Sequence, residues 1–247
     1  MQILDLTLGT PEENLALEEA LLEEAEALAA AGGPIEDGAG EVMRLWESPS
    51  YFVVVGAGGN VERDVFVTDC QNAGIPILRR ISGGGTVLQG PGCLNYSLVL
   101  RIANHPQCAD VSATNRYVLG RVQQALRPIV GAVEIRGISD LAVADKKFGG
   151  SAQRRRRHCV LFHGTLLYGF DLPLISKYLR QPAKTPDYRA GRAHEEFLTN
   201  VAAEAEALKY ALRCEWNAQQ PYRGKALELV PDLVKTRYGT NEWNFRF

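Results

Sequence analysis

A run of three glycines, residues 83–85, separates two apolar segments at residues 75–78 and 94–100. Because glycine lacks a Cβ atom, this backbone can adopt positive φ angles and approach a ligand closely. Successive amide N–H groups in such a loop can point toward one anion, and the guanidinium of Arg80 adds paired donors for a carboxylate or a phosphate. The segment therefore predicts a bed for an anionic group, with a plain glycine-rich turn as the alternative.

Two adjacent lysines, Lys146 and Lys147, precede a second glycine step at residues 149–150. If this segment is a strand, the two side chains point to opposite faces, so only one of them can enter a pocket. Asp140, on the strand before, can pair with that lysine or bind a metal ion. An exposed strand lysine is the alternative interpretation of Lys147.

His163 lies in an apolar run at residues 159–168 and is followed by Gly164. A histidine in such a run is either a hydrogen-bonded core residue or a ligand contact, and the glycine allows close approach of another backbone or of a ligand. Four consecutive arginines, residues 154–157, precede this run. They form either a solvated hairpin tip or a docking patch for an acidic protein partner.

The composition is that of an ordinary globular protein. The 247 residues are 46% hydrophobic and 23% charged, with a net charge of -2, so the chain can bury a core and lacks the basic character of nucleic-acid-binding proteins. The five cysteines are scattered without a CxxC pair, which favours reduced thiols in the cytoplasm. There is no evident signal peptide and no apolar run long enough to cross a bilayer, so no membrane partner is predicted.

A mixed sheet with peripheral helices is the economical architecture for the elements that must position these residues. The segments predicted as strands are residues 3–8, 42–46, 52–55, 75–78, 94–100, 133–135, 141–144, 147–152 and 159–168. The predicted helices are residues 11–31, 61–72, 110–130, 171–179, 195–216 and 226–238, the first with a capping box at Thr10 and Glu13 and the last interrupted by Pro231. The polar segment 181–194 is predicted to be a mobile loop and a candidate lid.

The segments RRISGGGTV, SDLAVADKKFGGSAQ and HGTLL, together with ENLALEEALL near the N-terminus, resemble the lipoate–protein ligase family in order and spacing. The resemblance covers roughly residues 1–200. It implies an α/β fold with a mixed, largely antiparallel sheet, of the kind shared by biotin ligases, class II aminoacyl-tRNA synthetases and octanoyltransferases. It also implies ATP-dependent activation of lipoate to lipoyl-AMP, followed by transfer of the lipoyl group to a lysine of a carrier.

The same resemblance assigns roles to individual residues. Lys147 matches the lysine whose ammonium binds the carboxylate and the α-phosphate. The residues expected to hold the lipoyl-adenylate are Arg80, Ser82, Gly83, Gly84, Gly85, Thr86, Asn95, Asp140, Gly150, Ser151, Ala152, His163, Gly164 and Thr165. The implied cofactors are ATP and Mg²⁺, with lipoate as the substrate, and no metal ligands are assigned.

Three departures from the family pattern leave the acyl donor open. Gln89-Gly90 stands where the family carries His-Asp, Gly92-Cys93 stands where it carries Gly-Asn, and residues 56–60 lack its arginine. Because QGPG is similar to the HGPG of octanoyltransferases, an ATP-independent acyltransferase that uses Cys93 is the second hypothesis; otherwise Cys93 is a small buried filler. A non-catalytic protein that binds a lipoyl carrier or sequesters the cofactor is the third.

We expect residues 1–247 to form one catalytic domain with a helical extension from about residue 195. In the family, a Trp-Asn-Phe segment introduces a small accessory domain, and residues 243–245 match it just before the last residues. The resemblance therefore implies either a separate subunit that supplies this domain or an enzyme that closes its site alone. The expected partner is a lipoyl carrier, similar to the glycine cleavage carrier or to the lipoyl domain of 2-oxoacid dehydrogenases.

Overall fold

The structure is a computed structural model that describes residues 1–32 and 40–247. Within these residues, the main sheet has eight strands in the order β11-β1-β2-β6-β10-β9-β8-β7. Their bounds are β1 Gln2–Asp5, β2 Val42–Trp46, β6 Cys93–Arg101, β7 Glu134–Arg136, β8 Asp140–Val143, β9 Lys146–Arg155, β10 Cys159–Leu167 and β11 Gln220–Pro221. Strands β11, β1 and β2 are parallel, and every neighbouring pair from β2 to β7 is antiparallel. The predicted mixed, largely antiparallel sheet is confirmed.

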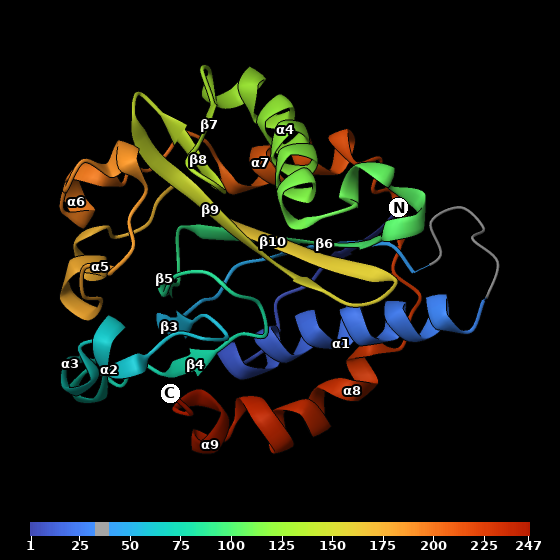
Figure 1. Cartoon of the computed structure of the whole chain (residues 1–247), viewed down its shortest axis with the longest axis horizontal. Coiled ribbons are helices and arrows are strands. Elements are labelled where there is room, and N and C mark those ends of the chain that lie inside the picture. The colour runs from blue at the N-terminus through green and yellow to red at the C-terminus, as the bar shows by residue number, and fades with distance from the viewer. Residues whose placement is uncertain (33–39) are drawn as a thin grey trace.

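Helices cover both faces of the main sheet (Figure 1). Helix α1, Pro11–Ala30, and helix α8, Ala226–Leu233, lie on one face, where α1 buries an apolar side that includes Leu17 and Leu21. Helix α4, Val111–Val130, and helix α7, Ala205–Glu215, cover the opposite face, where their apolar side chains pack against β6 and β10. The two faces therefore have separate cores, and the sheet between them is shielded from water on both sides.

A second sheet of three strands has the order β4-β3-β5 within the described residues. Its strands are β3 Phe52–Val55, β4 Ile77–Arg79 and β5 Val87–Gln89, and the short helices α2 Val61–Asp64, α3 Val67–Asn72 and α5 Pro173–Tyr178 pack beside it. Strand β5 is absent from the sequence prediction because three residues carry too little periodicity. Both glycine-rich segments follow strands of this sheet, so the small sheet fixes where they lie.

The predicted helix at residues 195–216 is wrong, because the structure divides it into α6, His194–Phe197, and α7. The segment between them is extended. The backbone N–H of Thr199 donates to the carbonyl of Lys147 at 2.9 Å, and that of Val201 donates to Leu167 at 2.9 Å. These hydrogen bonds to β9 and β10 outweigh the local helical pattern.

The last predicted helix continues past Pro231 inside α8 and changes only at Val234, where the π-helical turn η4, Val234–Tyr238, begins. The remaining short helices are η1 Ile102–Asn104, η2 Pro106–Cys108, η3 Asp187–Arg189 and α9 Asn241–Asn244. No helix of the described part of the chain combines the length and apolarity needed to cross a bilayer. All five cysteines are free, and four of them are buried.

Candidate functional site

The register of the main sheet brings many of the predicted site residues into two adjacent rows. Asn95 on β6 is opposite Thr165 on β10, Thr165 is opposite Gly150 on β9, and Gly150 is opposite Asp140 on β8. The next row places His163 opposite Ala152. Because paired residues share one face of a sheet, and because positions two apart on a strand share it too, both rows lie on one face. His163 contacts Glu18 of α1 from this face, so it is the side of the sheet on which α1 packs.

Lys147 reaches the same face through a β-bulge. Ala142 pairs with Lys147 and Leu141 pairs with Gly149, so Phe148 is the extra residue on β9. The bulge directs Phe148 into the core beneath α4 and returns Lys147 to the face of Gly150. The Lys147 Nζ lies 2.7 Å from the Asp140 Oδ1, and its side chain is 27% exposed.

Lys146 is exposed, whereas Lys147 is partly buried. The two side chains therefore differ in burial, and the entry of Lys147 into a ligand pocket stays a prediction.

Arg80 lies beneath the glycine bend, which we define as residues 83–85. Its guanidinium donates to the carbonyls of Gly83 at 2.6 Å, Gly85 at 2.9 Å and Val54 at 3.2 Å. Burial lowers the pKa of Arg80 to about 10 against the opposing effect of Glu18, so the group stays charged. These contacts differ from the expected role, because the guanidinium supports the bend from below instead of presenting free donors to an anion.

The orientation of the bend follows from these contacts. In a trans peptide, the carbonyl of one residue and the N–H of the next point in opposite directions. Since the carbonyls of Gly83 and Gly85 point to Arg80, the N–H groups of Gly84 and Thr86 point away from it. The three glycines are exposed, and Gly84 has a φ of +92. The bend therefore offers outward amide donors over a buried positive charge.

The bend and the lysine meet on β9. A Cβ atom on Gly84 would lie 3.7 Å from the Cβ of Ala152, and a Cβ atom on Gly150 would lie 2.8 Å from the Lys147 Nζ. Gly150 and Ala152 are two residues apart on one strand face, which corresponds to about 7 Å. The ammonium and the glycine bend therefore lie over neighbouring positions on one face of β9.

A chain of hydrogen bonds fixes the start of the bend. The Arg80 Nε donates to the Ser82 Oγ at 2.9 Å, the Ser82 Oγ lies 2.6 Å from the His163 Nε2, and the His163 Nδ1 lies 2.5 Å from the Glu18 Oε2. An ionised carboxylate can only accept, so Nδ1 carries a proton. His163 is thus a hydrogen-bonded histidine that ties the bend to α1 through β10.

Glu18 is the buried end of that chain. Its carboxylate also accepts from the Trp46 Nε1 at 3.1 Å and from the Ser97 hydroxyl. Burial raises the pKa of Glu18, but His163, Arg44 and Ser97 outweigh this effect and lower it to about 2. The carboxylate is therefore ionised at neutral pH. From the sequence, Glu18 and Glu19 could be identified only as glutamates near the apolar stripe of a helix; both are buried.

In three of the predicted site residues, the side chain, or the space that a side chain would take, is already in contact with another part of the protein. The Ser151 hydroxyl donates to the Ser139 carbonyl at 3.1 Å, on the face opposite to Ala152. The Thr86 hydroxyl donates to the Asp64 Oδ2 at 3.0 Å. A Cβ atom on Gly164 would lie 2.5 Å from the Tyr96 Oη, so this glycine makes room for a core tyrosine.

Arg79 is a positioning residue that the sequence did not reveal. Its guanidinium donates to the carbonyls of Gly56 at 2.9 Å, Gly59 at 2.8 Å and Asn244 at 3.1 Å, and the Trp243 Nε1 donates to the Arg79 carbonyl at 2.8 Å. The C-terminal helix α9 is therefore connected through Arg79 to the glycine-rich segment at residues 56–60. No local signal could have found the contacts with α9, because Trp243 and Asn244 lie 164 and 165 positions from Arg79.

The described residues do not assemble a protein-only metal centre, since they contain no group of three or more His, Cys, Asp or Glu side chains placed to hold an ion. Asp140 is paired with Lys147, and Asp145 pairs with Arg136 and Arg192. This donor set does not fit a resident Mg²⁺.

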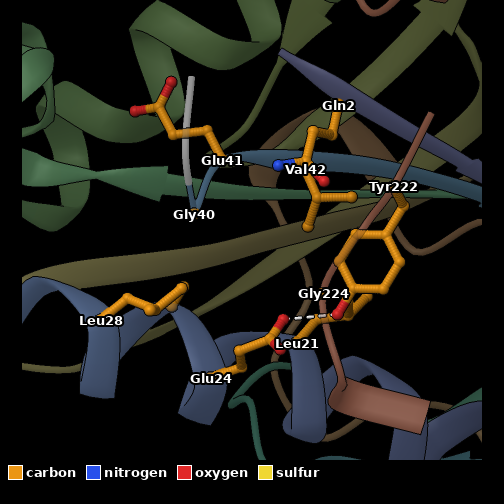
Figure 2. A pocket seen from close by; sticks show the side chains of 10 residues that line it. Gln2, Leu21, Glu24, Leu28, Gly40, Glu41, Val42, Tyr222 and Gly224 are labelled. Carbon is orange, nitrogen blue, oxygen red and sulfur yellow. Dashed lines mark hydrogen bonds between the residues drawn. The ribbon is translucent and has the colours of Figure 1, made fainter. Parts of the chain in front are cut away.

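A separate pocket lies between α1 and the segment that contains Tyr222 (Figure 2). The Tyr222 hydroxyl donates to the Glu24 carboxylate at its edge. None of the ten lining residues belongs to the predicted site.

Gly56 lies directly beneath the glycine bend, where a Cβ atom would be 2.2 Å from the Gly84 carbonyl oxygen. We expect Gly56→Ala to displace the bend and to lower the free energy of unfolding by about 1–3 kcal/mol. Gly58→Ala is the matched control, because a Cβ atom there meets nothing within 4 Å. Urea unfolding of both variants measures the difference; equal stabilities would show that the bend does not press on Gly56.

Residues 10–212 match the family model described as the lipoyl protein ligase A/B catalytic domain. The chain is 33% identical over 252 residues to a putative lipoate-protein ligase A from Aeropyrum pernix, covering 96% of this chain and 89% of that protein. It is also 26% identical to the octanoyltransferase LipM from Carboxydothermus hydrogenoformans over 95% of this chain and 94% of that protein. The chain spans only 45% of the probable lipoate-protein ligase A from Mycoplasma pneumoniae.

Solved structures of lipoate protein ligases share the fold of this chain. The bi-partite lipoate protein ligase of Thermoplasma acidophilum aligns with a TM-score of 0.81 at 24% identity, over 99% of this chain and 95% of that chain. A structure of a putative lipoate protein ligase from that organism with bound lipoic acid, and one of lipoate-protein ligase A bound with ATP, each give a TM-score of 0.79 at 22% identity, over 99% of this chain and 98% of each of theirs. These likenesses confirm the predicted fold class.

Proposed function

Because the chain belongs to the family of lipoyl protein ligase A/B catalytic domains, we propose that it is a lipoate–protein ligase that uses ATP. In this reaction lipoate becomes lipoyl-AMP, and the lipoyl group then passes to a lysine of a carrier. One observation carries the proposal: the Lys147 ammonium and the glycine bend lie on the same face of β9, about two residues apart.

The first half-reaction joins the lipoate carboxylate to the α-phosphorus, and pyrophosphate leaves. Negative charge is then shared between the carboxyl and phosphate oxygens. Lys147 supplies a positive charge at this point, and the outward N–H groups of Gly84 and Thr86 supply fixed donors. Arg80 adds a buried charge beneath the bend, which stabilises an anion above it without contacting it.

In the second half-reaction the amine of the acceptor lysine attacks the lipoyl carbonyl, its nitrogen loses one proton to water as the amide forms, and AMP leaves. The amine must be neutral to act as a nucleophile. Lys147 and the bend hold the departing phosphate, so the same donors serve both halves. The expected acceptor is a lipoyl domain or lipoyl carrier protein, since the Thermoplasma acidophilum ligase with the same fold is described together with its E2 lipoyl domain as one lipoylation system.

A separate accessory subunit belongs to this proposal as a partner to be tested, because the Thermoplasma acidophilum ligase is bi-partite. Residues 1–247 are proposed to act as one catalytic domain. The free, mostly buried cysteines suit a reducing compartment, so we place the activity in the cytoplasm.

The test combines the purified chain with ATP, lipoate and a lipoyl domain, with and without a candidate accessory subunit. We expect pyrophosphate release that depends on lipoate and a mass gain of one lipoyl group on the lipoyl domain. Acyl transfer from a carrier thioester without ATP, together with no pyrophosphate release, would overturn the proposal in favour of an acyltransferase. Tight binding of lipoyl-AMP with neither activity would favour a non-catalytic protein.

The acyltransferase alternative rests on the likeness to LipM and needs a reactive cysteine. Cys93 is 1% exposed, and burial together with nearby Glu47 raises the pKa of its thiol to about 12 despite a hydrogen bond with Thr165. A thiol in this state is a poor nucleophile at neutral pH. The geometry therefore favours the interpretation of Cys93 as a buried filler.

Replacing Cys93 with serine separates the two hypotheses. We expect Cys93→Ser to retain lipoate-dependent pyrophosphate release within about twofold of the wild type, because a small buried side chain is replaced by one of similar shape. Loss of acyl transfer from a carrier thioester in this variant, with an unchanged melting temperature, would instead identify Cys93 as the nucleophile.

A further inference from the structure

Asp140 is held from two sides. Its Oδ1 pairs with the Lys147 Nζ at 2.7 Å, and its Oδ2 accepts a hydrogen bond from the Tyr188 hydroxyl at 2.8 Å. Asp140 is 8% exposed, so few other donors can reach its oxygens. Tyr188 comes from η3 within the loop at residues 181–193, far along the chain from both partners.

Resting on the function proposed above, we propose that Tyr188 is a positioning residue that orients Asp140 and through it the Lys147 ammonium. A carboxylate held by one partner can rotate about its Cβ–Cγ bond. With both oxygens engaged, the plane of the carboxylate is fixed, and one oxygen stays directed at the lysine. Lysine is a flexible side chain with a point charge, so its position depends on such a partner.

The ring of Tyr188 is itself firmly placed. It lies 5.0 Å from the Arg136 guanidinium and 5.1 Å from the Phe197 ring. Burial, with the carboxylate of Asp140 beside it, raises the pKa of Tyr188 above its usual range. The hydroxyl therefore remains a donor at every pH at which the protein would be assayed.

The loop around Tyr188 is fastened to the turn before Lys147. Arg192 donates to the Tyr188 carbonyl at 2.6 Å and to the Asp145 carbonyl at 3.1 Å, and it pairs with the Asp145 carboxylate at 3.2 Å. On the other side, the Thr199 N–H donates to the Lys147 carbonyl. The loop therefore holds the Lys147 side chain through the contact of Tyr188 with Asp140. The segment that follows the loop holds the Lys147 backbone.

Tyr188→Phe tests this role, because it keeps the ring between Arg136 and Phe197 and removes only the hydroxyl. We expect kcat for lipoate-dependent ATP–pyrophosphate exchange to fall about tenfold, as for the loss of a hydrogen bond to a charged group, with KM for lipoate nearly unchanged. Tyr222→Phe is the matched control, since its hydroxyl also donates to a carboxylate but at the pocket of Figure 2. It should retain wild-type kcat.

A double-mutant cycle with Asp140→Asn decides whether Tyr188 acts through Asp140. If it does, the double variant should be no slower than Asp140→Asn alone. Additive losses in kcat, or wild-type kcat in Tyr188→Phe, would overturn the proposal.

A second measurement needs no enzymatic activity. Acetylation of the folded chain with N-hydroxysuccinimide acetate, followed by peptide mass spectrometry, gives the rate at Lys147 relative to exposed Lys146. We expect this ratio to rise several-fold in Tyr188→Phe. An unchanged ratio would overturn the positioning role even if the wild type showed no ligase activity, whereas absent ligase activity with a raised ratio would overturn only the proposed function.

Discussion

Lys147→Ala is expected to lower lipoate-dependent pyrophosphate release by about a hundredfold or more, because it removes one charge-stabilising donor at the reacting oxygens. Lys147 is the ammonium that the bulge at Phe148 directs to the face shared with Gly150. Quenched-flow measurement of lipoyl-AMP formation gives the rate of this step directly. The loss should appear in kcat, with lipoate affinity changed much less.

Lys146→Ala is the control for this prediction, since the neighbouring side chain is exposed and carries the same charge. Its effect on the rate should be small. Equal losses in the two variants would mean that the ammonium contributes only to the general positive field around the substrate, and the specific contact assigned to Lys147 would be wrong.

The sequence was sufficient for the residues whose signals are local. The glycine run predicted a bend, the capping residues predicted the start of α1, and the alternation of β9 and β10 predicted adjacent antiparallel strands; all three elements are found in the structure. This order of strands implies that residues on neighbouring strands form rows across the sheet. It does not fix the register of the strands, because nothing local to Thr165 or Gly150 specifies which residue lies opposite.

What the sequence could not supply depends on distant contacts. The extra residue at Phe148 reverses the face of Lys147 relative to a regular strand, and a bulge leaves no clear sequence signal here. Two partners of Arg79, Trp243 and Asn244, come from α9. The segment at residues 198–204 is extended because of hydrogen bonds to other strands. The inward role of Arg80 likewise depends on how the bend closes over it.

Glu18→Gln is expected to produce the largest loss of stability. Glu18 is 4% exposed and accepts from His163, Trp46 and Ser97, with the buried Arg44 guanidinium nearby. Removing one partner of a buried charge network leaves the remaining charge uncompensated, which typically costs about 3–5 kcal/mol. Urea unfolding at pH 7 measures this loss.

Glu23→Gln on the same helix is the control, because Glu23 forms only a partly exposed ion pair with Arg156. Such pairs contribute about 0–1 kcal/mol. A loss in Glu18→Gln no larger than in this control would show that the buried network adds nothing to stability.

The pH dependence gives an independent test of the same carboxylate. Its pKa is about 2 in the folded protein and 4.5 as the reference value, so the folded-state pKa is depressed. The corresponding stability, on the order of 3 kcal/mol, is fully present above pH 4.5 and is lost as the pH falls toward 2. The difference in free energy of unfolding between the wild type and Glu18→Gln should therefore be constant from pH 7 to about 5 and should shrink below that. A difference that stays constant down to pH 3 would mean that the ionised charge of Glu18 is not the source of the stabilisation.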